Sequence, residues 1–179
     1  MNRRKFIKAT VGSGIAIGFV GSAVWFSIDE YTKPLTIDAG LNLIKSISSQ
    51  SISHVGEWNP TQIFNHCAQS VEYSMIGFPE HKSDLFKNTV GQLAFSAFSA
   101  KGKMTHGLNE VIPGAPELTA DNNIALALSR LKKSMLAFKH YDGELAPHFA
   151  YGELSKDEYE AAHVMHLLNH LNEIKVSSA

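Results

Sequence analysis

The sequence predicts an all-α protein: a four-helix bundle with an N-terminal export or anchor segment and one extra short helix. Three observations predict this class. Apolar residues recur at spacings of three and four over long segments, and two of these segments open with good helix caps. Valine and isoleucine are too sparse and scattered for many short strands. The length of 179 residues fits one ordinary domain.

The first 28 residues predict a targeting or anchoring segment. NRRKFIK carries paired arginines, and the uncharged residues 9–28 follow it. This order resembles a twin-arginine export signal, and four glycines keep the hydrophobicity of the apolar part low. A single membrane-spanning anchor is the alternative, because about 20 apolar residues suffice to cross a bilayer. No clear A-x-A cleavage site follows, so a cleaved signal and a retained membrane tether both stay open.

The charge of the chain gives no footprint for nucleic acid. Four of the 16 basic residues precede Asp29, the first of 17 acidic residues. Residues 29–179 therefore carry 12 basic and 17 acidic residues, a balance of -5. Such a surface repels a phosphate backbone, so we expect no nucleic-acid partner.

The remaining chain predicts a linker over residues 29–35 and a bundle over residues 36–175. Within LTIDAGLNLIKSI, apolar residues at helical spacing predict a first helix that ends near Ser53. Trp58 can pack on Ile63 as a hydrophobic staple at the start of a second helix, which should run to about Gly77. Its cap, first-position proline and third-position glutamine agree: Asn59, Pro60 and Gln62.

Three further segments complete the bundle. A short third helix is predicted by the spacing of Val90, Leu93, Ala97 and Phe98, with a stop at Gly102. Residues 104–120 contain two prolines and predict a long functional loop or lid. The fourth helix has the seam of a packed bundle: Ile124, Leu128, Leu131, Met135 and Phe138. A capping box from Ser155 to Glu158 opens the last helix, which should continue to about Ile174.

Histidine is abundant, at nine residues, and the last helix holds His163, His166 and His170. His166 and His170 lie one helical turn apart, about 40° from each other around the axis, so both can reach one ion. His66 on the second helix is the candidate third ligand. Three imidazoles leave a position open for water or substrate and favour zinc or nickel. The alternatives are histidines on a solvated face and a partly buried core histidine.

The helical wheel predicts a site near the bundle rim. The apolar arc of Val164, Leu168 and Leu171 is centred about 130° away from the direction of the two ligands. A rim position allows access for a substrate, but it equally fits surface histidines.

Two weaker candidates for catalysis accompany the triad. His163 could support or replace a ligand, although packing against Tyr159 is the alternative. Glu173 could orient a ligand or act as general base, although a solvated carboxylate is the alternative. Cys67 is expected to fill a small buried apolar position, and as the single cysteine it excludes an internal disulfide framework. His106 and His148 lie in loops that could cover the site, and the remaining histidines are expected at the surface: His54, His81 and His140.

Two sequence blocks, WNPTQIFNHCAQS and YGELSKDEYEAAHVMHLLNHL, resemble the DinB-like metalloenzyme superfamily, in a subgroup known mainly as a domain of unknown function. The resemblance covers about residues 36–175. It implies a four-helix bundle with a three-histidine metal site, which by motif position is His66, His166 and His170. Characterised relatives include thiol S-transferases and metal-dependent hydrolases, so the resemblance implies a metal-activated water or thiol.

The function expected from these features is a divalent-metal-dependent enzyme of the periplasm or cell envelope that acts on a small molecule. Export disfavours a cytoplasmic thiol cosubstrate, so hydrolysis is favoured over thiol transfer. The expected partner during export is the twin-arginine translocon, a membrane tether through residues 9–28 stays open, and a homodimer is compatible with the sequence. The alternative is a non-catalytic bundle that binds metal or serves an envelope structure.

Overall fold

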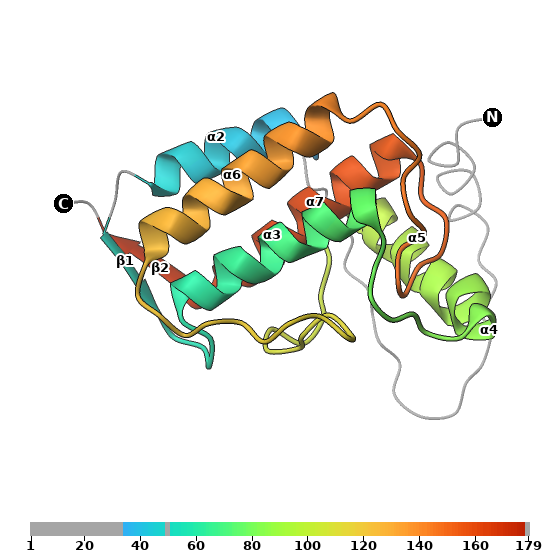
Figure 1. Cartoon of the computed structure of the whole chain (residues 1–179), viewed down its shortest axis with the longest axis horizontal. Coiled ribbons are helices and arrows are strands. Elements are labelled where there is room, and N and C mark those ends of the chain that lie inside the picture. The colour runs from blue at the N-terminus through green and yellow to red at the C-terminus, as the bar shows by residue number, and fades with distance from the viewer. Residues whose placement is uncertain (1–33, 49–50, 178–179) are drawn as a thin grey trace.

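The computed structural model describes residues 34–48 and 51–177, and four long helices lie side by side in it (Figure 1). The predicted all-α bundle is confirmed. The predicted targeting segment lies outside the described residues. Among the described helices, none combines the length and the hydrophobicity that a bilayer crossing requires. The bundle consists of α2 (Ile37–Ile47), α3 (Pro60–Ile76), α6 (Ile124–His140) and α7 (Lys156–His170).

The two helices that carry the histidines begin where their caps predict. At α3 the Asn59 side chain accepts from the Gln62 amide at 3.0 Å, and the Gln62 side chain accepts from the Asn59 amide at 3.1 Å. Pro60 occupies the first turn, where its missing N–H loses nothing. At α7, Ser155 and Glu158 form the same reciprocal pair. Both caps fix the register of a helix from its first turn.

The core lies between the four helices and contains the residues of the predicted α6 seam. Leu131, Met135 and Phe138 are fully buried, and Leu128 is nearly so. Gly40 lets α2 approach closely, since a Cβ there would lie 3.2 Å from the Met135 sulfur. The absence of a side chain at this position therefore sets the spacing between α2 and α6.

Two predicted helix ends are wrong: a strand occupies the end predicted for the first helix, and a 3-10 turn occupies the end predicted for the last. The first helix ends at Ile47 and not near Ser53, and the last ends at His170 and not at Ile174. Strand β1 (Ser51–His54) pairs antiparallel with β2 (Ile174–Ser177), which follows the 3-10 turn η2 (Leu171–Glu173). The backbone groups of the two strands pair with each other. The helical periodicity of either segment alone does not reveal this pairing.

The segment between α3 and α6 begins with an arm of consecutive helical pieces: α4 (Asp84–Phe86), the π-helical turn η1 (Lys87–Gly91) and α5 (Gln92–Lys101). The predicted end at Gly102 is confirmed, and this glycine has a φ of 66°. Val90 and Leu93, whose spacing predicted the helix, are nevertheless exposed, while Phe95 is buried. The extra residue of the π turn shifts the helical phase, so the simple pattern identified the helix but not its packed face.

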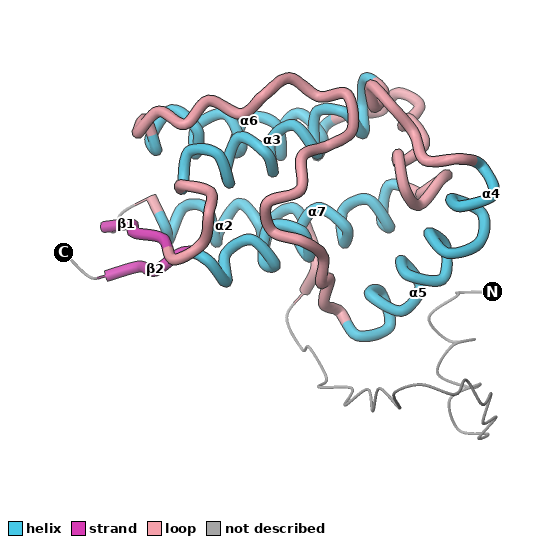
Figure 2. The backbone as a smooth tube through the Cα atoms, turned by 90° about the horizontal axis from the view of Figure 1, so that it is seen from below, coloured by secondary structure: helices cyan, strands magenta, loops and turns pink. Residues whose placement is uncertain are grey.

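Residues 103–123 form the predicted irregular loop, which crosses the bundle between α5 and α6 (Figure 2). Met104, Ile112 and Leu118 are buried and anchor it to the core. Gln69 donates to the Pro116 carbonyl at 3.3 Å. The loop is therefore packed onto α3, and it lies over the helices that carry the candidate site.

Candidate metal centre

His66 of α3 and the pair His166 and His170 of α7 meet inside the bundle. The His166 Nε2 atom lies 3.1 Å from the Nε2 atoms of both His66 and His170. One ligand nitrogen from each ring lies within 4.8 Å of the others. All three side chains are at least nine-tenths buried. The structure thus brings together the three histidines that the sequence selected.

The distances between these nitrogens fit a single ion. With each bond about 2.0 to 2.1 Å long, neighbouring ligand nitrogens are about 3.3 Å apart in a tetrahedron and about 2.9 Å apart in an octahedron. The two separations from His166, each 3.1 Å, lie between the two values, and the third pair of ligand nitrogens is at most 4.8 Å apart. The centre can therefore hold a tetrahedral ion such as zinc or a six-coordinate ion such as nickel.

Burial keeps the three imidazoles neutral, as metal ligands must be. It lowers the pKa of His66 to about 3, with His106 adding a smaller effect. Burial, followed by the neighbouring His66 and His106, lowers the pKa of His170 to about 2. The pKa of His166 is also far below its usual value, first through burial and then through the adjacent histidines. At neutral pH each ring can offer an unprotonated nitrogen to an ion.

The rings are held by packing. Trp58 makes an edge contact with His66 at a centroid distance of 5.0 Å and stacks on His170 at 6.0 Å. The Nδ1 atoms of His66 and His170 are buried and have no hydrogen-bond partner among the described residues. The sequence predicts Trp58 only as a hydrophobic staple at the start of α3. The structure shows that it also contacts two rings of the centre.

His106, from the loop, is a fourth histidine beside the centre. Its ring lies 5.0 Å from that of His166 and 5.2 Å from that of His170, measured between centroids. Its Nδ1 donates to the Gly107 carbonyl at 2.7 Å, which leaves Nε2 as the acceptor in the neutral ring. Asn169 of α7 donates to the His106 carbonyl at 3.5 Å and ties the loop to the ligand helix. The prediction that this loop residue covers the site agrees with its position.

The prediction of a rim position is wrong. His170 is fully buried, whereas Leu168, expected to face inward, is only partly buried. Trp58 and the loop that carries His106 cover the face of α7 that the wheel assigned to solvent. A wheel weighs only the residues of its own helix, so it cannot account for cover supplied by a distant loop.

Comparison with known families gives one match. The family model described as "Protein of unknown function (DUF1569)" matches residues 32–177. The chain belongs to the DUF1569 family. Neither the curated proteins nor the solved structures contain a match to it. The match includes every residue of the three-histidine centre.

The two weaker catalytic candidates lie apart from the converging nitrogens of this DUF1569 chain. His163 packs on Phe138 and Tyr159, and its Nε2 donates to the Ser74 hydroxyl at 3.2 Å, since that hydroxyl donates to the Val71 carbonyl. Burial lowers the pKa of His163 to about 3. These contacts are those of a packed, neutral core histidine.

Glu173 follows α7 in η2, where its backbone carbonyl accepts from the Val55 amide at 3.0 Å. Its carboxylate lies against Gly56, whose missing side chain leaves room for it. One carboxylate oxygen is buried without a hydrogen-bond partner among the described residues. The side chain thus packs beside the loop before α3, outside the three-histidine group.

The other residues singled out from the sequence take structural or surface positions. Cys67 is buried in the core, where burial raises the pKa of its thiol. His148 lies in a separate aromatic cluster, where its Nδ1 accepts from the Ala150 and Tyr151 amides. The expected surface histidines are exposed: His54, His81 and His140.

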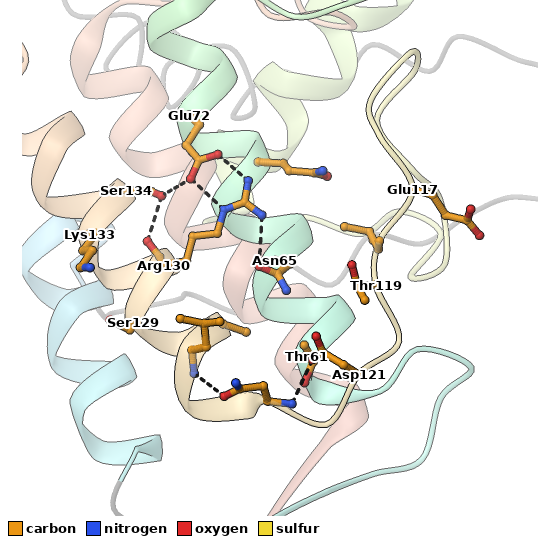
Figure 3. Close-up of a pocket in the computed structure, with 15 residues that line it drawn as sticks. Thr61, Asn65, Glu72, Glu117, Thr119, Asp121, Ser129, Arg130, Lys133 and Ser134 are labelled. Atoms are coloured by element: carbon orange, nitrogen blue, oxygen red, sulfur yellow. Dashed lines mark hydrogen bonds and ion pairs between the residues drawn. The ribbon is translucent and has the colours of Figure 1, made fainter.

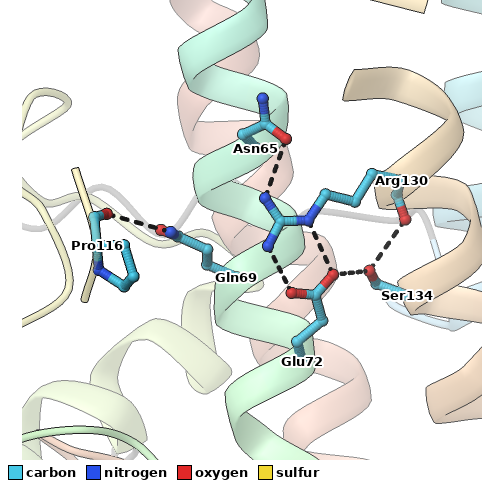
Figure 4. Close-up of polar contacts among 6 residues, drawn as sticks. All are labelled: Asn65, Gln69, Glu72, Pro116, Arg130 and Ser134. Atoms are coloured by element: carbon cyan, nitrogen blue, oxygen red, sulfur yellow. Dashed lines mark hydrogen bonds and ion pairs between the residues drawn. The ribbon is translucent and has the colours of Figure 1, made fainter. Parts of the chain in front are cut away.

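A polar groove of about 560 Å³ lies on another flank of α3, between it and α6 (Figure 3). Arg130 holds Glu72 through two hydrogen bonds of 2.6 and 3.0 Å and donates to Asn65 at 3.1 Å (Figure 4). Ser134 donates to the same carboxylate at 2.7 Å. The Arg130 guanidinium and the Glu72 carboxylate satisfy each other's hydrogen bonds. The main role of these groove residues is therefore to join α3 to α6.

Proposed function

We propose that this DUF1569 chain binds one divalent ion through His66, His166 and His170 and uses it in a metal-dependent reaction of the cell envelope. The convergence of three buried histidine nitrogens carries this proposal: the His166 Nε2 atom lies 3.1 Å from the Nε2 atoms of His66 and His170, and all three ligand atoms lie within 4.8 Å of one another. Histidines on a solvated face would stay hydrated, whereas burial removes these three imidazoles from water. Zinc and nickel are the favoured ions, because the donor set is entirely imidazole.

The ligand set supports a reaction as well as binding. Three protein ligands are the usual number in catalytic zinc sites, where a further position takes water or substrate. A bound ion would lower the pKa of a water or thiol ligand and thereby provide a nucleophile at neutral pH. The protein's part is to present three neutral nitrogens in fixed positions, with Trp58 and His106 beside them.

Hydrolysis of a small molecule is the favoured reaction type. The resemblance of the two histidine-bearing blocks to the DinB-like superfamily supports both hydrolysis and thiol transfer. The twin-arginine pattern in the first residues supports export to the envelope and therefore disfavours a cytoplasmic thiol cosubstrate. We therefore place thiol S-transfer second.

Elemental analysis of the purified full chain tests the metal part. After incubation with zinc or nickel and removal of excess ion, wild type should retain one ion per chain. His166→Ala should lose it, because this residue supplies the nitrogen that contacts both other ligands. The exposed control His140→Ala should keep it. Wild type without bound ion, or His166→Ala with full occupancy, would refute the proposal.

A non-catalytic metal-binding role is the second candidate, and the burial of the three rings favours it. The side chains are between 0 and 9% exposed, under Trp58 and His106. The cobalt-substituted chain separates the two roles, since an open position changes the visible spectrum when a small anion binds. A spectral change with azide supports the enzyme, whereas an unchanged spectrum supports metal binding alone.

A further inference from the structure

Exposed apolar side chains gather on the arm formed by α4, η1 and α5. Leu85 is 76% exposed, Val90 55% and Leu93 72%, and Phe86 is also open to solvent. The opposite side of the arm faces the protein, where Phe95 is buried against Tyr151 at a ring distance of 5.4 Å. The arm therefore has one packed side and one apolar side without cover among the described residues.

The π turn aligns these side chains. A π helix has about 4.4 residues per turn, so residues five apart lie within about 50° of each other around the axis. Leu85 in α4 and Val90 in η1 have this spacing and therefore occupy neighbouring positions on the surface of the arm. Leu93 follows three residues later, within α5, where this spacing again gives about one turn. Gly91 faces the protein instead, since a Cβ there would lie 1.9 Å from the Ala150 carbonyl oxygen. The apolar residues thus form one continuous face, which we name the arm face: Leu85, Phe86, Val90 and Leu93.

The arm together with its two flanks is the basic part of an acidic domain, and within the arm Lys87 pairs with Asp84 at 2.9 Å. Residues 81–103 contain four lysines and one aspartate, a balance of +3. The other residues from 29 to 179 contain 8 basic and 16 acidic residues, a balance of -8. Lys82 and Lys103 flank the arm at its two ends and are exposed. An apolar face flanked by lysines can contact both the acyl chains and the phosphates of an anionic membrane surface.

The described chain begins at the end of the bundle that carries the arm. Asp38, in the first turn of α2, pairs with Lys139 near the end of α6 at 2.6 Å. The connection from α6 to α7 reaches the arm, where Gln92 donates to the Tyr151 carbonyl at 2.9 Å. Figure 1 shows the arm at this end, away from the β1–β2 pair.

The linker limits how far this end can lie from a membrane. Six residue steps separate Ile28, the last residue of the uncharged segment, from Pro34. An extended chain advances at most about 3.6 Å per residue, so these steps span about 20 Å. If residues 9–28 stay in a bilayer, the start of α2 and the nearby arm lie close to the membrane surface.

We propose that the arm face docks on the surface of an anionic phospholipid bilayer and orients the domain on it. The inserted leucine, valine and phenylalanine side chains supply the apolar contact, and the flanking lysines contact the lipid phosphates. This role is independent of the metal centre. It gives the exposed face, the charge of residues 81–103 and the end of the bundle at which the described chain begins one common explanation.

A fluorophore on the arm tests this docking in the full chain. Leu93→Cys receives an environment-sensitive label, because the native Cys67 is buried and unreactive. The matched control is Leu126→Cys, since Leu126 is 64% exposed and lies at the start of α6, at the other end of the bundle. Both are reconstituted in vesicles of phosphatidylcholine with about one third phosphatidylglycerol, some of it brominated as a quencher.

The label at position 93 should be quenched strongly by brominated lipid, and the label at position 126 should not. Replacing both Lys82 and Lys103 by Gln should lower the ratio of docked to undocked arm by about thirty-fold, at about 1 kcal/mol for each lysine. Leu85→Glu should abolish quenching at position 93. An unchanged circular dichroism spectrum shows that each variant is folded.

Three results would overturn the docking. The first is equally weak quenching at positions 93 and 126. The second is protection of the label at position 93 that rises with the protein-to-lipid ratio, which assigns the face to a second copy of the chain. The third is protection that persists in detergent and is insensitive to brominated lipid, which assigns the face to the N-terminal segment itself.

Discussion

Replacement of His163 by Phe should make the metal-free protein more resistant to acid. His163 is buried among Phe138 and Tyr159, and burial lowers its pKa from 6.5 to about 3 in the folded state. Below pH 6.5 the His163 ring is protonated in the unfolded chain but stays neutral in the folded chain. The folded state therefore loses stability as the pH falls toward 3. Above pH 6.5 the ring is neutral in both the folded and the unfolded chain, so His163 causes no loss of stability there.

The size of the effect follows from the distance between the pH and the unfolded pKa. At about pH 5 the difference is about 1.5 units, which at 1.36 kcal/mol for each unit gives about 2 kcal/mol for one buried histidine. Phe retains the ring contacts. Ser74 stays satisfied, because its hydroxyl donates to the Val71 carbonyl at 2.7 Å. The variant should thus keep the fold and lose this part of the acid sensitivity.

Urea unfolding of the metal-free chain at about pH 7.5 and about pH 5 measures the loss of stability that His163 causes. Between these pH values wild type should lose about 2 kcal/mol more stability than His163→Phe. The control His140→Phe replaces an exposed ring and should lose as much as wild type. Equal losses in wild type and His163→Phe would refute the assignment of His163 as a neutral core residue.

Three other substitutions test single contacts. His106→Ala should retain one ion per chain in elemental analysis and lower metal affinity by less than about ten-fold, since its ring lies outside the converging set; loss of the ion would make it a ligand. Gly91→Ala places a Cβ 1.9 Å from the Ala150 carbonyl oxygen, so the arm should be cleaved faster in limited proteolysis than in the exposed control Ala97→Ser; equal rates would contradict the close packing. Asn59→Ala removes the cap of α3 and should lower the free energy of unfolding in urea by about 1 kcal/mol, and no change would contradict the cap.

The sequence contains the local part of this structure. The caps at Asn59 and Ser155 and the seam of α6 are encoded by neighbouring residues, so they predict helix starts and the buried face correctly. The pair His166 and His170 is likewise local, because one helix fixes its geometry. His66 needed the family resemblance, since nothing in α3 alone indicates which distant residues its ring will meet.

The rest depends on contacts between distant segments. The β1–β2 pair joins residues more than 100 positions apart, and neither strand has a strong pattern of its own. The π turn shifts the phase of the arm and leaves Leu93 outside. The cover over His170 comes from Trp58 and from the loop around His106. The sequence suggested a loop over the site, but not the depth at which this loop buries the three rings.

X-ray absorption spectroscopy of the full chain loaded with zinc tests the metal centre most directly. The predicted spectrum shows three imidazole nitrogens about 2.0 to 2.1 Å from a single ion. In His166→Ala the imidazole signal should fall together with the bound zinc, because this ring joins the other two at 3.1 Å. A zinc ion with fewer than three imidazole ligands in wild type, or the same three-imidazole spectrum in His166→Ala, would contradict the account.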